Sequence, residues 1–152
     1  MKPEEMRVVL TGATGGIGRD IARELAACGA NLLLVGRSTE RLADLERELR
    51  MNGADVSHVA ADVGQYEGIT RVVEAAAGMP GGPANVLVNN AGIWPAAYVH
   101  QLTEEAWDRT LAVNLKGPFL TCREAVRRWR NAGRGGRIVN VSSPAAFLGA
   151  TT

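Results

Sequence analysis

Short apolar runs alternate with amphipathic stretches along the chain. The runs are rich in β-branched residues and poor in charges, which is typical of strands buried on both faces. They predict strands at 7–11, 31–35, 55–63, 85–90 and 137–141. Between them, apolar residues recur at helical spacing and predict helices that start near Ile17, Ser38 and Ile69, with a further helix over most of 103–131.

Residues with special backbone preferences mark the ends of these elements. Ser38 and Thr103 are suited to cap helices, because a side-chain oxygen can accept a free first-turn N–H. Gly29 and Gly53 are suited to end them. Gly117-Pro118 should bend or divide the long helix, since proline lacks the N–H that a helix interior needs.

The alternation predicts an α/β fold with a parallel sheet, an incomplete doubly wound arrangement of about five strands with helices on both faces. In such sheets ligands lie beyond the carboxyl ends of the strands. That edge would carry the loops 11–18, 36–38, 62–64, 89–95 and 142–150. Most of the unusual residues fall in these loops, which is the main reason to expect a site there.

Composition and charge exclude several classes of function. The chain has 152 residues, which we interpret as one domain, and a net charge of +1 gives no reason to expect nucleic acid or anionic membranes as partners. Cys28 and Cys122 are expected to be reduced thiols, and His58 and His100 fit no metal-ligand spacing, so no metal is predicted. No run reaches the roughly 18 apolar residues of a membrane span, and the N-terminus lacks signal-peptide character, so we expect a cytoplasmic protein.

The stretch "VVLTGATGGIG" at 8–18 carries the clearest chemical signal. Glycines follow a strand and open a helix, so bare amides and the helix N-terminus form a positive pole suited to a diphosphate. Gly12 permits the tight turn, Gly16 a close approach of the ligand, and Gly18 close packing of the helix. The spacing is Gly-x-x-x-Gly-x-Gly rather than a Walker loop, and a tight turn without a ligand is the alternative.

Four motifs in register give the chain a family resemblance. "TGATGGIG", "NNAG" at 89–92, Asn114 in "VNLKGPF" and "GRIVNVSS" at 136–143 occur in the order and spacing of the short-chain dehydrogenase/reductase family. The resemblance covers essentially the whole chain. It implies a Rossmann-type sheet, a nicotinamide dinucleotide cofactor, and hydride transfer between a carbonyl and an alcohol, as in 3-oxoacyl reductases and related sugar dehydrogenases.

The resemblance also implies which residues bind the cofactor. Asp62 resembles the acid that contacts adenine, although a strand-end Asp could equally form a turn or cap a helix. For Asn89 the sequence supports two roles equally: bridging backbone groups at the sheet edge, or contacting the cofactor. The predicted cofactor residues are Gly12, Thr14, Gly15, Gly16, Ile17, Gly18, Arg37, Asp62, Val63, Asn90, Ala91 and Gly92.

Arg37 favours NADP over NAD. Gly36 stands where an acid would accept the ribose hydroxyls of NAD, and the arginine that follows could instead bind a 2′-phosphate. A solvated arginine beside a turn is the alternative. Gly15 weakens the NADP interpretation slightly, because many NADP-preferring relatives carry a basic residue there.

By motif position, Ser143 resembles the serine that positions the substrate oxygen and Asn114 the asparagine that holds a water in the proton path. Without the family, they would be a strand-end hydroxyl and a helix-surface amide. The family's Tyr-x-x-x-Lys is not found: neither Tyr66 nor Tyr98 has a lysine four positions later. The chain is therefore expected to be an N-terminal part of a carbonyl or alcohol oxidoreductase that is inactive alone, or a non-catalytic nucleotide-binding module. The helix around 115–131 is a candidate surface for homo-oligomers.

Overall fold

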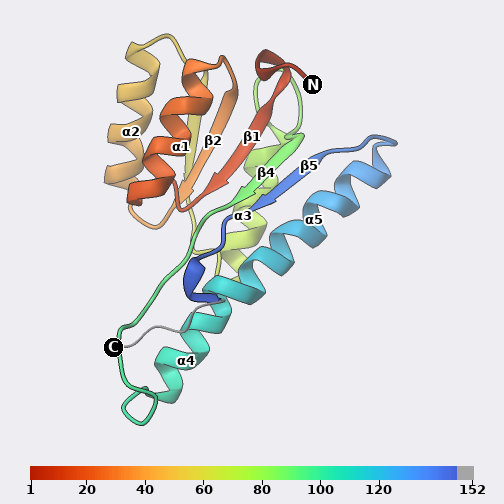
Figure 1. Cartoon of the computed structure of the whole chain (residues 1–152). Coiled ribbons are helices and arrows are strands. Elements are labelled where there is room, and N and C mark those ends of the chain that lie inside the picture. Colours follow the sequence, from red (N-terminus) through yellow and green to blue (C-terminus); the bar gives the residue numbers. More distant parts are fainter. Residues whose placement is uncertain (147–152) are drawn as a thin grey trace.

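The computed structural model describes residues 1–146, and it has the expected α/β fold. All five strands are parallel, in the order β3-β2-β1-β4-β5, and helices cover both faces of the sheet (Figure 1). The strands are β1 Arg7–Thr11, β2 Asn31–Gly36, β3 Val56–Ala60, β4 Val86–Asn89 and β5 Arg137–Asn140. The α-helices are α1 Gly16–Ala27, α2 Thr39–Met51, α3 Tyr66–Ala77, α4 Glu104–Leu111 and α5 Gly117–Asn131, with short helical turns at Pro3–Glu5 and Pro144–Ala146.

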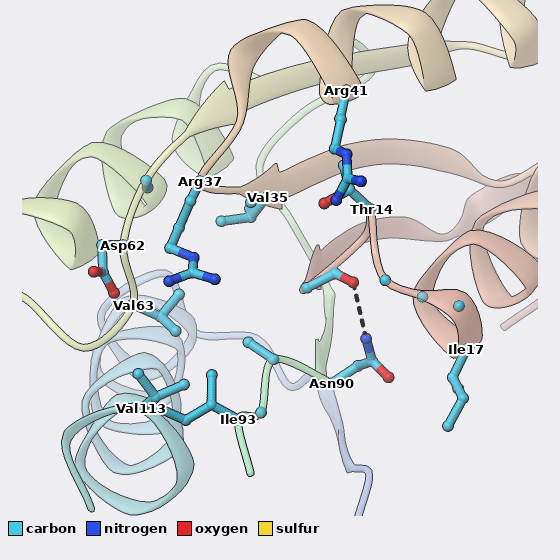
Figure 2. Close-up of a pocket in the computed structure, with 18 of the residues that line it drawn as sticks. Thr14, Ile17, Val35, Arg37, Arg41, Asp62, Val63, Asn90, Ile93 and Val113 are labelled. Carbon is cyan, nitrogen blue, oxygen red and sulfur yellow. Dashed lines mark hydrogen bonds between the residues drawn. The ribbon is translucent and has the colours of Figure 1, made fainter. Parts of the chain in front are cut away.

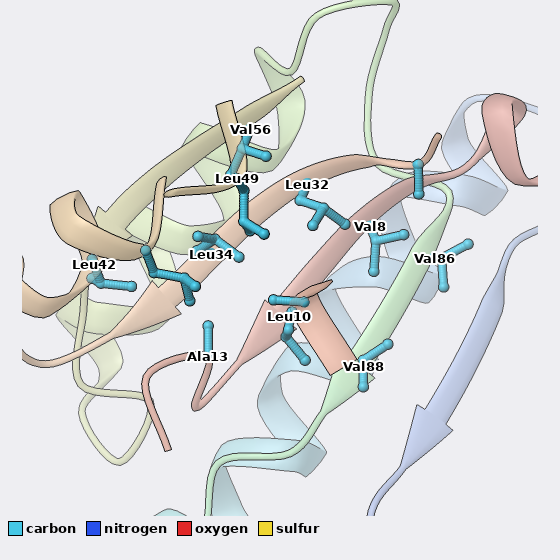
Figure 3. Packing of buried hydrophobic residues seen from close by; sticks show 13 residues of the cluster. Val8, Leu10, Ala13, Leu32, Leu34, Leu42, Leu49, Val56, Val86 and Val88 are labelled. Atoms are coloured by element: carbon cyan, nitrogen blue, oxygen red, sulfur yellow. The ribbon is translucent and has the colours of Figure 1, made fainter. Parts of the chain in front are cut away.

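Alternate residues of each central strand enter different cores. Val8 and Leu10 of β1 face α1 and α2, and Figure 3 shows them in one cluster with Leu32, Leu34 and Leu42. The side chains between them on the strands face α3 and α5 instead; Val9, Leu33, Val35 and Leu87 belong to that second core with Trp129. This two-sided burial is why the strands read as continuous apolar runs.

The predicted ends of the helices are largely confirmed. Ser38 caps α2, its Oγ accepting the Arg41 N–H at 3.3 Å. Gly29 and Gly53 follow α1 and α2 with φ of +85° and +84°, a conformation that favours glycine. The third strand is shorter than predicted. It ends at Ala60 because Asp62 begins a turn, in which the Gly64 N–H donates to its carboxylate at 2.9 Å.

The long helix is divided, as Gly117-Pro118 predicts, but the irregularity lies just before that pair. Residues Ala112–Lys116 form a wider π-helical segment between α4 and α5, which continue one another in Figure 1. Pro118 cannot donate to the carbonyl of Asn114, so an ordinary α-helical bond is missing at this point. Thr103 caps α4 as expected, accepting the Ala106 N–H at 3.2 Å. Over the described residues, 1–146, no helix has the length and apolar character to span a bilayer.

Candidate functional site

A pocket of about 380 Å³ opens at the carboxyl ends of the strands (Figure 2). The loops that follow β1, β2, β3 and β4 form it, together with one face of α4 and the π segment. The structure brings every predicted cofactor residue to its wall: Gly12, Thr14, Gly15, Gly16, Ile17, Gly18, Arg37, Asp62, Val63, Asn90, Ala91 and Gly92. Two further wall residues, Gly36 and Ile93, lie in loops predicted at this edge but were not named as cofactor residues, and the sequence contained no indication of the others, which are Val35, Arg41, Ala61, Arg109 and Val113.

The glycine loop has the close approaches that its glycines allow. Gly12 has φ of +66°, and a Cβ there would lie 2.8 Å from the Cα of Ala91. A Cβ on Gly18 would lie 2.1 Å from the Gly12 carbonyl oxygen, so this glycine packs α1 against its own loop. A Cβ on Gly16 would meet nothing within 4 Å, so that side of the loop is open. Because Gly15 caps α1 without a side chain, the first-turn amides keep their positive pole.

Thr11 organises the β1 and β4 ends of the pocket. Its buried hydroxyl accepts the N–H groups of Asn90 and Ala91 at 3.0 and 3.1 Å and donates to Val88 O at 3.4 Å. In return, the Asn90 side chain donates to the carbonyls of Thr11 and Gly12, both at 3.1 Å, and the bond to Gly12 is the dashed line in Figure 2. The sequence showed a threonine at the head of the glycine motif, but its partners lie about 80 residues away and gave no signal.

Asn89 has a structural role. It is buried, with its Oδ1 accepting from the Thr121 hydroxyl at 2.8 Å and its Nδ2 donating to the Asn140 Oδ1 at 2.9 Å. These bonds tie β4 to α5 and β5. Asn89 does not line the pocket.

Two arginines form a basic rim beyond β2. Arg37 is exposed, and Figure 2 shows its guanidinium reaching across the pocket toward Val63 and Asp62. Arg41, from the first turn of α2, lies beside Thr14 in the same view. At Gly36 a Cβ would lie 3.3 Å from the Thr14 hydroxyl, so there is little room for an acidic side chain between these cations.

Asp62 both lines the pocket and makes a turn. Its Oδ1 accepts the Gly64 N–H, and its Oδ2 accepts from Arg109 Nη2 at 2.6 Å. Burial raises the pKa of the carboxyl, but the bonds from Arg109 and Gly64 and the nearby charge of Arg37 more than offset it and leave the pKa below its ordinary value. The carboxyl is therefore ionised at neutral pH. Asp62 therefore fits both alternatives that the sequence left open, because it forms a turn and also lines the pocket.

The two predicted catalytic residues do not line the pocket. Asn114 lies in the π segment and binds both backbone groups of Ile93: its Oδ1 accepts the N–H at 2.9 Å and its Nδ2 donates to the carbonyl at 2.8 Å. It thereby fixes the chain just beyond Gly92. Ser143 is exposed beyond β5, and its Oγ accepts the Ala145 N–H at 3.3 Å. The loop 142–150 predicted at this edge lies partly outside the described residues. In residues 1–146, no three His, Cys, Asp or Glu side chains are grouped as metal ligands.

Comparisons with known proteins match this chain to one family. A family model described as short chain dehydrogenase matches residues 6–152. A protein of Streptomyces violaceoruber, named as a ketoacyl reductase of granaticin polyketide synthase, is 40% identical over 140 residues, which cover 89% of this chain and 50% of that protein. The chain spans about half the length of the curated relatives it matches.

Solved structures with bound cofactor are similar as well. A metagenomic short-chain oxidoreductase in complex with NADP is 35% identical, with a TM-score of 0.86, over 97% of this chain and 66% of that chain. L-sorbose reductase of Gluconobacter frateurii, complexed with NADPH and L-sorbose, is 33% identical, with a TM-score of 0.88, over 95% of this chain and 55% of that chain.

Proposed function

The chain belongs to the short-chain dehydrogenase family, and from that premise we propose that it is the cofactor-binding part of an NADP-dependent oxidoreductase. The reaction is hydride transfer between the nicotinamide and a ketone or secondary alcohol. One observation carries the proposal: all twelve residues expected to bind the cofactor line a single pocket at the start of α1. The binding of NADP and NADPH by similar structures supports it.

The glycine loop fits a diphosphate. The loop forms a tight cradle only with glycine at positions 12 and 18, because a Cβ there would clash with the backbone of Ala91 or of Gly12, whereas Gly16 faces open space. The free first-turn amides of α1 supply donors and a positive pole for the two phosphates. Asn90 and Ala91 close the far side of this cradle and are held in place by Thr11.

The proposed preference for NADP is based on the basic rim formed by Arg37 and Arg41. Arg37 and Arg41 offer two guanidinium groups beside Gly36, where the side chain of an acid that would select NAD would crowd the Thr14 hydroxyl. A guanidinium makes charge-assisted bonds to a phosphate but cannot accept bonds from ribose hydroxyls. The added phosphate of NADP should therefore strengthen binding.

The bound nicotinamide would supply the hydride, and the residues of this chain would bind and orient the reactants. Ser143 is proposed to position the substrate oxygen, and Asn114 to hold the chain at Ile93 beside the cofactor. The names of similar proteins point to a ketoacyl or a sugar carbonyl as the substrate class. The helix around 115–131 is the proposed homo-oligomer surface, because Leu115, Phe119 and Val126 are exposed there. The cytoplasm, where the free thiols of Cys28 and Cys122 stay reduced, is the proposed compartment.

Fluorescence titration with NADPH and NADH tests the cofactor proposal. We expect NADPH to bind more tightly by about tenfold or more, the value of one charge-assisted hydrogen bond. Arg37→Asp should reduce this ratio, while Arg71→Asp, the same charge change on the exposed surface of α3, should not. An unchanged ratio in Arg37→Asp would remove this arginine from the cofactor site.

A nucleotide-binding module without turnover is the second candidate. It is favoured by one fact: Thr70 and Leu102 stand four positions after Tyr66 and Tyr98, where the family pattern needs a lysine. Because an N-terminal part of an enzyme would also bind NADPH without turnover, the coding DNA beyond Thr152 separates the two: an in-frame Tyr-x-x-x-Lys would favour the enzyme, and a stop codon the module. Turnover by this chain would favour the enzyme.

A further inference from the structure

An ion pair joins α4 to the loop after β3 at the edge of the pocket. Arg109 Nη2 donates to Asp62 Oδ2 at 2.6 Å across 47 residues of sequence. The two side chains are 30% and 29% exposed, so the pair is partly withdrawn from water, and both residues line the pocket. It therefore differs from the exposed surface pairs that contribute little to proteins.

Two independent bonds fix the direction of the Asp62 carboxylate. Its Oδ1 is held by the Gly64 N–H and its Oδ2 by Arg109. Gly64 also leaves room for the guanidinium, because a Cβ at this position would lie 2.7 Å from Arg109 Nη1. Each carboxylate oxygen can accept a second hydrogen bond. The pair thus leaves Asp62 able to accept a bond from a ligand in the pocket.

The charges around Asp62 keep it an acceptor only. Arg109 faces it from α4, and Arg37 from the loop after β2. Together with the Gly64 N–H they outweigh burial and hold the pKa of Asp62 below its ordinary value. An ionised carboxylate accepts hydrogen bonds and donates none.

The surroundings suit a flat aromatic group. Figure 2 shows Val63, Val113 and Ile93 on the same side of the pocket as Asp62. Val63 and Val113 are buried, so they present a firm apolar wall next to one charged acceptor. A purine base with an exocyclic amino group satisfies both features.

We propose that Arg109 is a positioning residue that lets Asp62 distinguish an amino-purine from an oxo-purine base. The inference rests on the proposed dinucleotide binding. An adenine amino group donates to the carboxylate. Hypoxanthine presents a carbonyl oxygen in the same place, and two acceptors repel each other.

The test compares NADPH with reduced nicotinamide hypoxanthine dinucleotide phosphate by fluorescence titration of the full chain. The wild-type chain should prefer NADPH by about tenfold or more, the value of one hydrogen bond to a charged group. Arg109→Met should bring this ratio toward one. Loss of the arginine also removes a cause of the lowered pKa, so a protonated Asp62 appears at higher pH than in the wild type. As the pH is lowered, the ratio in the variant should therefore begin to fall at a higher pH than in the wild type.

Three other variants test whether Arg109 orients the Asp62 carboxylate or only holds α4 against the loop after β3. Arg71→Met removes the same charge from the exposed surface of α3 and should leave the ratio unchanged. Arg109→Lys keeps the positive charge but lacks the planar guanidinium with its several N–H donors. It should restore part of the preference for NADPH. Asp62→Asn gains an amide donor and should shift the preference toward the oxo-purine. This variant and Arg109→Lys carry the test if Arg109→Met does not fold.

The outcomes are distinct. Equal weakening of both dinucleotides in Arg109→Met, with an unchanged ratio and pH profile, would make Arg109 a brace only and overturn the inference while leaving the proposed function intact. Failure of the wild-type chain to bind either dinucleotide would overturn the proposed function itself. A selective fall in the NADPH ratio, restored in part by lysine, would support both.

Discussion

Strands β1 and β5 look alike in sequence but differ in burial. Both are short, parallel and rich in β-branched residues, yet Val8 is 0% exposed and Val139 is 50% exposed. β1 pairs with β2 and β4 and has helices over both faces, whereas within the described part of the chain β5 pairs with β4 alone. An apolar pattern predicts a strand, but its position in the sheet decides how much that strand contributes to stability.

Val8→Ala should give the largest loss of stability. Removing two fully buried methyl groups and leaving a cavity between β1 and its neighbours should lower the free energy of unfolding by about 2–3 kcal/mol. Urea denaturation followed by circular dichroism measures it. A loss of less than about 1 kcal/mol would show that the centre of the sheet relaxes freely and would remove the contrast with β5.

Thr11→Val should cost less but affect the site as well. The substitution keeps the shape and leaves the N–H groups of Asn90 and Ala91 without their acceptor, which should cost about 1–2 kcal/mol. NADPH binding should weaken with it. Thr110→Val is the matched control, since within residues 1–146 that hydroxyl donates only to the Ala106 carbonyl of its own helix. Equal effects of the two substitutions would contradict a special role for Thr11.

Ser38→Ala should have an intermediate effect away from the cores. It removes the acceptor of the Arg41 N–H at the start of α2 and should cost about 1 kcal/mol. Ser38→Asp, which keeps a capping oxygen, should retain most of the stability. Thermal unfolding of the three proteins checks both expectations, and a destabilised Ser38→Asp would argue against capping as the cause.

Val139→Ala should have the smallest effect and completes the matched pair with Val8→Ala. The half-exposed side chain of β5 should change the free energy of unfolding by no more than about 0.5 kcal/mol. The same urea experiment measures it. A loss equal to that of Val8→Ala would mean that β5 is covered in solution, for instance by a second copy of the chain.

The sequence predicted the parts of the molecule that depend on local pattern. Burial on both faces leaves continuous apolar runs, so the strands and the pocket loops could be placed, and the glycine motif placed the start of α1. The end of β3 was predicted too late, because the turn at Asp62 competes with the sheet. The division of the long helix was predicted from Gly117-Pro118, but its π form was not, since helical spacing does not reveal which carbonyl each N–H selects. Arg109 and the bonds from Asn90 and Ala91 to Thr11 were missed because they depend on contacts between residues far apart in the chain.

The grip of Asn114 on Ile93 has a consequence for variation among related chains. The Asn114 side-chain amide bonds to both the N–H and the carbonyl of Ile93, as a neighbouring strand would. The root of the segment between β4 and α4 is thereby anchored, while its outer part, with the exposed Trp94, Tyr98 and Val99, makes no comparable bond to the sheet within the described residues. Insertions and replacements in that outer part can accumulate without moving Ile93 and the pocket wall. Related chains can therefore acquire new specificities by changing only the segment around Trp94, Tyr98 and Val99.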